Sequence, residues 1–233
     1  MQNRRPTARA PLTPVPQLLA LTFSTGVIDA VGYLGLDRVF AGNMTGNVVI
    51  LGMGLAGADL PVAGPSLALG AFVLGAALGG RVLRGSVTGW TPRTRALLLG
   101  VTTLLTLGAA LALAGDLGTH ETSAPSVLGM LVTAFLALAM GAQAAAARHV
   151  KVADVTTVVV TSTITGLAAD SWLGHRVDQP WARRGAAVVL MILGALAGAL
   201  LLQLHLVAGI AASAAITAIA ALLGHTNRDG LAR

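Results

Sequence analysis

Six stretches of this chain are almost entirely apolar, and each is close to the roughly 20 residues that a helix needs to span a bilayer. Inside the hydrocarbon every backbone N–H and C=O must be bonded within the protein, which restricts spanning segments to helices and closed barrels. The stretches therefore predict an all-α integral membrane protein. Its predicted transmembrane helices cover residues 17–36, 66–83, 96–114, 126–147, 186–203 and 206–223.

Composition agrees with a membrane protein. Hydrophobic residues make up 55% of the 233 residues and charged residues 10%, whereas soluble domains carry about 25% charged residues. The net charge of +6 does not indicate a nucleic-acid partner, because the basic residues are scattered over short loops, as membrane orientation requires. Cysteine is absent, which excludes disulfides and thiolate chemistry. The expected partner is the lipid bilayer.

Two further apolar segments, residues 43–58 and 154–169, are shorter and more polar than the six spans. A helix of that length reaches only about 24 Å, which is marginal for a crossing. If both segments dip into the membrane and return, 14 of the 15 lysines and arginines lie on one side with both termini, and only Arg38 lies on the other. Because positive charge collects on the cytoplasmic side, the sequence predicts two re-entrant segments and cytoplasmic termini.

The two halves of the chain resemble each other. FAGNMTGNVVILGMGLAG at residues 40–57 aligns with VADVTTVVVTSTITGLAAD at residues 152–170, and GAALGG at 75–80 resembles GALAGA at 194–199. We expect one membrane domain over residues 1–233. It consists of a first repeat at 17–115, a second at 126–224, and cytoplasmic tails at 1–16 and 225–233. Three crossings per half is an odd number, so the halves are inverted, an architecture of transporters and channels.

The start of the first short segment carries the most hydrogen-bonding capacity of the chain's apolar regions. Asn43, Thr45 and Asn47 precede an apolar run. They can satisfy the free backbone groups of a broken helix, or they can contact a substrate or line a pore. The N-terminus of such a half-helix carries partial positive charge and suits an anion or a dipolar solute.

Asp29 lies in the middle of the first predicted span. A carboxylate at that depth is costly and indicates a functional site by default. Proton coupling and cation binding are two roles open to it, and a hydrogen-bonded structural role is the alternative. Gln143, in the fourth span, could face the same region or bond neighbouring helices.

In the second half, Thr157, Thr161 and Thr165 are spaced by four residues and so share one helix face. A polar stripe facing lipid is unfavourable, so we expect this face to point inward, toward a substrate or toward backbone partners.

No pattern indicates enzymatic chemistry. His149, His175 and His205 have no metal-ligand spacing, and no nucleophile–base or phosphate-binding motif is present. We therefore expect no metal, no cofactor and no catalytic residue.

Several motifs resemble the YoaK family of bacterial multi-pass membrane proteins, which is classed by a domain of unknown function. They are FSTGVIDAVGYLGL at residues 23–36, FAGNMTGNVV at 40–49, GAALGG, and MGAQAAAARHV followed by TTVVVTSTITGLAAD. The family pattern favours Asn after the glutamine of the fourth span, where this chain has Ala144. The resemblance implies a bacterial inner-membrane protein and supplies no substrate.

The residues favour a small-solute transporter or channel, with a midplane site formed by the two re-entrant segments and with proton coupling through Asp29 as an option. A membrane scaffold or assembly protein without transport is the alternative, and an intramembrane enzyme is a third, less favoured class. The Gly-rich span at 66–83 leaves open whether it packs within the fold or between protomers of a homo-oligomer.

Overall fold

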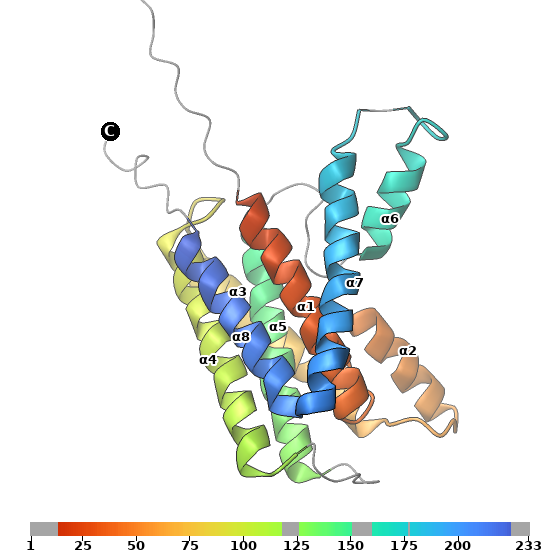
Figure 1. Cartoon of the computed structure of the whole chain (residues 1–233), viewed down its shortest axis with the longest axis vertical. Helices are drawn as coiled ribbons and strands as arrows, with labels where there is room; N and C mark the ends of the chain where they lie inside the picture. Colours follow the sequence, from red (N-terminus) through yellow and green to blue (C-terminus); the bar gives the residue numbers. More distant parts are fainter. Residues whose placement is uncertain (1–13, 118–125, 151–159, 177, 225–233) are drawn as a thin grey trace, which may run out of the picture.

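The computed structural model describes residues 14–117, 126–150, 160–176 and 178–224. These residues form eight α-helices and no strand (Figure 1). In chain order the helices are α1 (Val15–Gly35), α2 (Met44–Leu55), α3 (Ala63–Leu83), α4 (Pro92–Ala114), α5 (Val127–Val150), α6 (Val160–Ala169), α7 (Trp181–Leu204) and α8 (Leu206–Leu223).

Six of these helices, with 18 to 24 residues each, are long and apolar enough to cross a membrane, and α2 and α6 are the two shorter ones. The predicted all-α architecture of six spans and two short helices is confirmed. The helices α4 and α7 begin a turn earlier than their apolar runs. Thr91 forms a capping box with Thr94 ahead of Pro92, and Pro180 precedes α7, so local capping starts each helix before its apolar part.

Neither short helix connects opposite ends of the bundle. At the end of α1, Val39 packs against Ala68 of α3, and Gly64 lies against Asp37. The chain therefore leaves α1 and enters α3 at the same end, with α2 in between. Figure 1 shows α2 extending from mid-bundle toward that end and α6 extending from mid-bundle toward the other end.

The second short helix follows the same rule at the opposite end. Val150 at the end of α5 packs in one cluster with Leu18 at the start of α1. The helix α7 runs parallel to α1, because Gly194 lies against Phe23 and Gly198 against Val27. The chain therefore leaves α5 and enters α7 at one end of the bundle, as the charge distribution predicted.

Two close helix crossings organise the bundle. The helix α1 packs on α7 and α8, whereas α5 packs on α3 and α4, and α4 also contacts α8. Backbones touch at glycines in both crossings: Gly194 meets the carbonyl of Phe23, and Gly75 meets the carbonyl of Leu138. Gly75 and Gly79 of the second span therefore serve packing inside the fold, where small residues let membrane helices approach closely, whereas Gly70 and Gly80 face open space.

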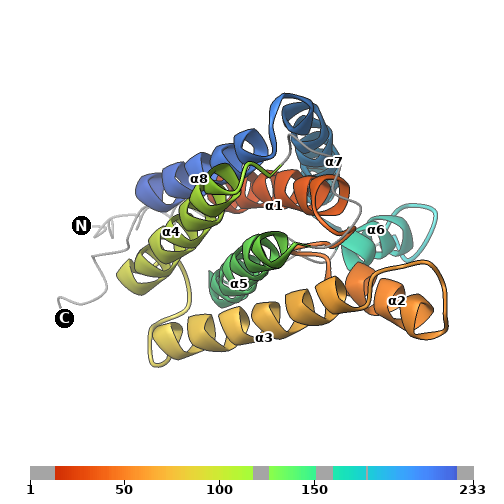
Figure 2. The same ribbon diagram turned by 90° about the horizontal axis from the view of Figure 1, so that it is seen from below.

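The two ends of the helical bundle differ from each other in charge. The side-chain amide of Gln17 donates to the carbonyl of Leu223 (3.5 Å), which places the start of α1 beside the end of α8. Every described arginine except Arg38 lies in a helix end or loop at this same end of the bundle. Figure 2, seen along the bundle, shows α5 surrounded by α1, α3 and α4, with α2 and α6 together on one flank.

Candidate functional site

Asp29 lies deep in the bundle and ties α1 to the segment that leads into α2. Its side chain is 6% exposed. One carboxylate oxygen, Oδ1, accepts hydrogen bonds from the backbone N–H groups of Gly42 (2.6 Å) and Asn43 (3.3 Å). The carboxylate therefore fixes the point at which the re-entrant chain turns inside the membrane.

The second oxygen of this carboxylate has different surroundings. Asp29 Oδ2 is shielded from solvent and has no hydrogen-bond partner among the described residues. Leaving such an acceptor unsatisfied in a buried place costs about 1–3 kcal/mol, more for a charged group. A proton on the carboxyl group would remove its charge, and a cation beside Oδ2 would pair with it.

Two asparagines build the start of α2. The Asn43 side chain caps the helix by accepting from the N–H of Gly46 (3.2 Å). Asn47 is fully buried. It accepts from the N–H of Phe40 (2.9 Å) and donates to the carbonyl of Phe40 (2.6 Å). Both side chains therefore satisfy backbone groups of a broken helix, which is one of the two roles that the sequence left open.

The turn that leads into α2 is held by two side chains. Asp29 accepts from the N–H groups of Gly42 and Asn43, which precede the helix, and Asn43 accepts from the N–H of Gly46 in the first helical turn. The partial positive charge of the helix N-terminus therefore lies beside a carboxyl group of the protein itself.

Gln143 connects α5 to the same region. Its Nε2 donates to the hydroxyl of Thr25 (3.0 Å) and to the carbonyl of Leu21 (3.4 Å), and its Oε1 accepts from Thr217 (3.5 Å). Thr25 lies one turn before Asp29, and its methyl group lies against Gly42. The glutamine thus reaches the neighbourhood of Asp29 through Thr25, without contacting the carboxylate itself.

A polar cluster crosses the bundle from this point. The hydroxyl of Ser24 is 2.5 Å from that of Ser213 and 3.3 Å from that of Thr217, and all three side chains are buried. With Thr25 and Gln143 these residues form what we call the hydroxyl cluster, which joins α1, α5 and α8. Every side chain in it has hydrogen-bond partners, so its members bond helices together.

The sequence reasoning missed four members of this cluster: Ser24, Thr25, Ser213 and Thr217. The sequence spacing could have indicated three of them. Thr25 precedes Asp29 by four residues, and Ser213 precedes Thr217 by four. Each pair therefore shares a helix face.

Thr45, Thr161 and Thr165 are not brought to this site. All three are exposed on the short helices, and Thr163 is the buried threonine of α6. The prediction that Thr161 and Thr165 point inward is wrong, because among the described helices α6 contacts α7 alone. Its other faces therefore remain uncovered. Thr157 lies outside the described residues.

Within the described ranges, no group of three His, Asp or Glu side chains is placed to hold a metal ion. The ion pair at the α6–α7 corner, from Arg184 to Asp170 (2.8 Å), joins the loop to the helix. It lies at the bundle's end, away from Asp29.

Comparison with known proteins places this arrangement in a family. A family described as "Protein of unknown function (DUF1275)" matches residues 17–223, which include all eight helices but the first two residues of α1. The chain belongs to this family. It is also 29% identical over 167 residues to the UPF0700 transmembrane protein YoaK of Bacillus subtilis (strain 168), covering 70% of this chain and 69% of that protein. No solved structure matches. The resemblance to the YoaK family is confirmed, and members of the DUF1275 family carry no assigned activity in their description.

Proposed function

We propose that this DUF1275 member is a transporter or channel of the bacterial inner membrane for a small solute, with proton coupling through Asp29. The observation that carries the proposal is the buried, unpartnered Oδ2 of Asp29. It lies on a spanning helix, at the point where a re-entrant segment turns. Irregular backbone at membrane depth is tolerated where protein buries it or where it lines a pathway, and a buried carboxylate there is a functional group by default.

Protonation of the Asp29 carboxyl group would change the contacts that hold the turn before α2. As long as Asp29 is charged, its carboxylate attracts the N–H groups of Gly42 and Asn43 strongly. A proton on the carboxyl group weakens these bonds, because charge-assisted hydrogen bonds are roughly twice as strong as neutral ones. Protonation and the position of the re-entrant segment are therefore coupled through two backbone groups.

Inverted repeats at residues 17–115 and 126–224 are part of this proposal. Under such a repeat α1 corresponds to α5, α3 to α7 and α4 to α8. The helix contacts support it, because α1 packs on α7 and α8 and α5 packs on α3 and α4. The registers agree as well. Gly26 of α1 meets Met191 and Ala195 of α7, and Gly141 of α5 meets Phe72 and Ala76 of α3.

The orientation proposed here puts both termini in the cytoplasm. The described arginines other than Arg38 lie at the end of the bundle that holds the start of α1 and the end of α8. Because positive charge is retained in the cytoplasm, that end is assigned to the cytoplasmic side. The short helix α2 then belongs to the outer half of the membrane and α6 to the inner half.

Proteoliposomes provide the test. The full chain is reconstituted with a pH-sensitive dye inside, and amino acids, organic acids, sugars, cations and inorganic anions are added in turn. Wild-type protein should change the internal pH with at least one class, and Asp29→Asn should abolish the change. Asparagine keeps an acceptor for Gly42 and Asn43 but cannot exchange a proton. Asp59→Asn, at an exposed loop residue, is the matched control.

A scaffold without transport is the second candidate, and the hydroxyl cluster favours it. The buried side chains of that cluster all have partners, as expected where polar groups serve only to join helices. In that case no solute moves protons through the wild-type protein. Alanine at Asp29 or Asn43 would then lower the melting temperature and nothing else.

A further inference from the structure

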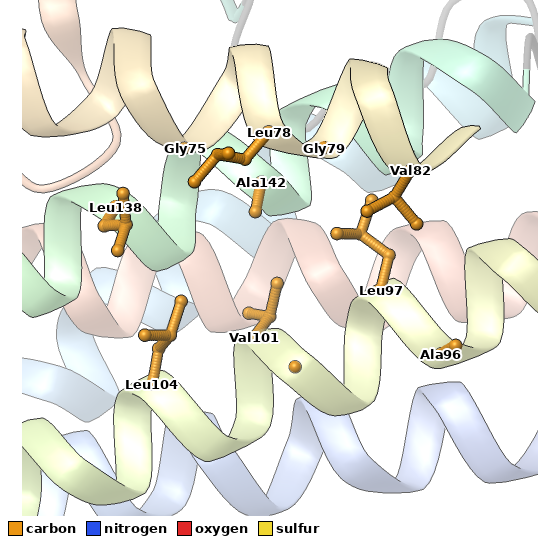
Figure 3. Close-up of a pocket in the computed structure, with 11 residues that line it drawn as sticks. Gly75, Leu78, Gly79, Val82, Ala96, Leu97, Val101, Leu104, Leu138 and Ala142 are labelled. Carbon is orange, nitrogen blue, oxygen red and sulfur yellow. The ribbon is translucent and has the colours of Figure 1, made fainter. Parts of the chain in front are cut away.

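A groove between α3, α4 and α5 opens on the outer surface of the bundle, far from the Asp29 turn (Figure 3). Its volume is about 440 Å³. Residues 75–82 of α3 and 96–104 of α4 supply the two walls, and Leu138 and Ala142 of α5 supply the floor. The lining residues are glycine, alanine, valine and leucine only, so the groove suits a hydrocarbon.

The groove has the length of one leaflet. Residues 96–104 of α4 rise by about 12 Å, and half of the hydrocarbon core measures about 15 Å. The lining begins at Val82, next to the end of α3, and at Ala96, in the second turn of α4. It therefore runs from the membrane surface on the arginine-rich side toward the middle of the bilayer.

The chemistry of the groove favours one occupant. Its lining is entirely apolar, and exposed arginines lie at the end of α3 and the start of α4. This combination fits an acyl chain joined to an anionic headgroup better than it fits a helix of a second copy. Gly100, on the α4 wall, keeps the space open, since a Cβ there would meet nothing within 4 Å.

Arginines surround the mouth of the groove. Arg93 lies one turn before Ala96 and Leu97 on the same face of α4. Its Nη1 donates to the carbonyl of Arg84 (2.5 Å), so its side chain reaches from α4 to the end of α3. Arg81 occupies the last turn of α3, and Arg81, Arg84 and Arg93 are all exposed.

No acidic side chain in the described part of the chain pairs with these three arginines. The guanidinium group keeps further N–H donors besides the one used by Arg93, and its planar fork matches phosphate. The mouth therefore offers unneutralised positive charge at the depth where lipid phosphates lie.

We propose that this groove binds a phospholipid with an anionic headgroup from the leaflet on the arginine-rich side. One acyl chain fills the groove, and the negatively charged headgroup phosphate is held by Arg93, Arg84 and Arg81. Shape selects the chain and charge selects the headgroup, so both parts can be tested separately.

Native mass spectrometry of the full chain in detergent tests the proposal, with phosphatidylglycerol and phosphatidylcholine of identical acyl chains added in turn. Wild-type protein should retain phosphatidylglycerol about tenfold more strongly, because both lipids carry the phosphate but the ammonium group of phosphatidylcholine is repelled by the arginines. Gly100→Leu fills the groove and should remove the adducts of both lipids. Arg93→Ala should remove the preference for phosphatidylglycerol while retaining acyl-chain binding.

Two control variants match these changes. Gly80→Leu adds the same side chain at another open position of the same membrane depth, outside the groove lining. Arg176→Ala removes an exposed arginine from the α6–α7 loop. Neither should alter lipid binding, and size-exclusion profiles check folding of every variant. Unchanged phosphatidylglycerol binding in Gly100→Leu, equal wild-type binding of both lipids, or a change of dimer mass instead of lipid adducts would each overturn the proposal.

Discussion

The α1–α7 and α3–α5 crossings share a pattern of glycine contacts, and they differ at the position of Asp29. Phe23, Gly26 and Val27 of α1 make the backbone contacts with α7 that Leu138, Gly141 and Ala142 of α5 make with α3. Three residues after the matched glycines, α1 has Asp29 and α5 has Ala144. One crossing thus carries a buried carboxylate bonded to its re-entrant segment, and the other carries a methyl group. Packing tolerates both residues, so packing does not explain the carboxylate.

The largest effect expected concerns the side from which the two re-entrant segments enter. The chain has no cysteine, so single cysteines can be introduced at Arg38 and Ala63 around α2, and at Arg148 and Arg176 around α6. An impermeant maleimide added to intact cells should label the first pair, and the second pair should react only after the membrane is opened. Labelling of one member of a pair alone would mean that the short segment crosses, and the inverted comparison would fail.

Alanine at the crossing glycines should have the next largest effect. A Cβ at Gly194 meets the carbonyl of Phe23, and a Cβ at Gly75 meets the carbonyl of Leu138. Because backbone cannot rotate away as a side chain can, each change should destabilise by about 3 kcal/mol or more, at the upper end of overpacking.

Thermal unfolding in detergent measures both glycine variants, with Gly70→Ala as a control at an open position. Similar losses at Gly75 and Gly194 would support equal crossings. A loss confined to one of them would break the comparison.

Asp29→Ala and Asp29→Asn probe the difference itself. Alanine at Asp29 leaves the N–H groups of Gly42 and Asn43 without their acceptor, and we expect a loss of about 1–3 kcal/mol in unfolding free energy. Asp29→Asn should lose less, since its amide oxygen can accept the same bonds. Chemical denaturation compares both variants with wild type. If Asp29→Ala is as stable as wild type, the carboxylate does not hold the α2 turn.

The smallest effect expected is at Asp37, beside the end of α1. Burial raises the pKa of this carboxyl group above its ordinary value, and the nearby Arg38 opposes the shift. The folded state therefore binds the proton more tightly than the unfolded state, and stability falls as pH rises through the window that begins at 3.8, the ordinary value. Solvent screens this partly exposed group, so Asp37→Asn should stabilise the protein by about 0.5 kcal/mol or less at pH 7.

Melting curves between pH 4 and 7 detect the effect at Asp37. The advantage of Asp37→Asn should shrink toward the acidic end. An advantage that grows on acidification would have the wrong sign for a raised pKa.

Length, hydropathy and charge were sufficient to predict the fold. The six spans follow from apolar length, and the return of both short segments follows from where the arginines fall. The start of α2 was predicted in part, because bonding of free backbone by Asn43 and Asn47 was one of the two roles that the sequence left open.

The partners of Asp29 could not be predicted in the same way. Its acceptor Oδ1 is satisfied by backbone 13 and 14 residues away, and backbone groups carry no sequence signature. The hydroxyl cluster joins residues 189 positions apart, which requires the helix arrangement to be known. The orientation of Thr161 and Thr165 was misjudged because the rule that polar faces point inward assumes a helix covered on several sides, whereas α6 contacts α7 alone among the described helices.

The bond between Ser24 and Ser213 also has a consequence for synthesis of the protein. The two residues are 189 positions apart, and ribosomes add about 5–20 residues per second. On the order of 10 to 40 s therefore pass between the appearance of α1 and that of its last hydroxyl partner. During this time Ser24 of α1 lacks its hydroxyl partners on α8. We expect this buried polar group to be satisfied by water or by the insertion machinery until the last helix arrives.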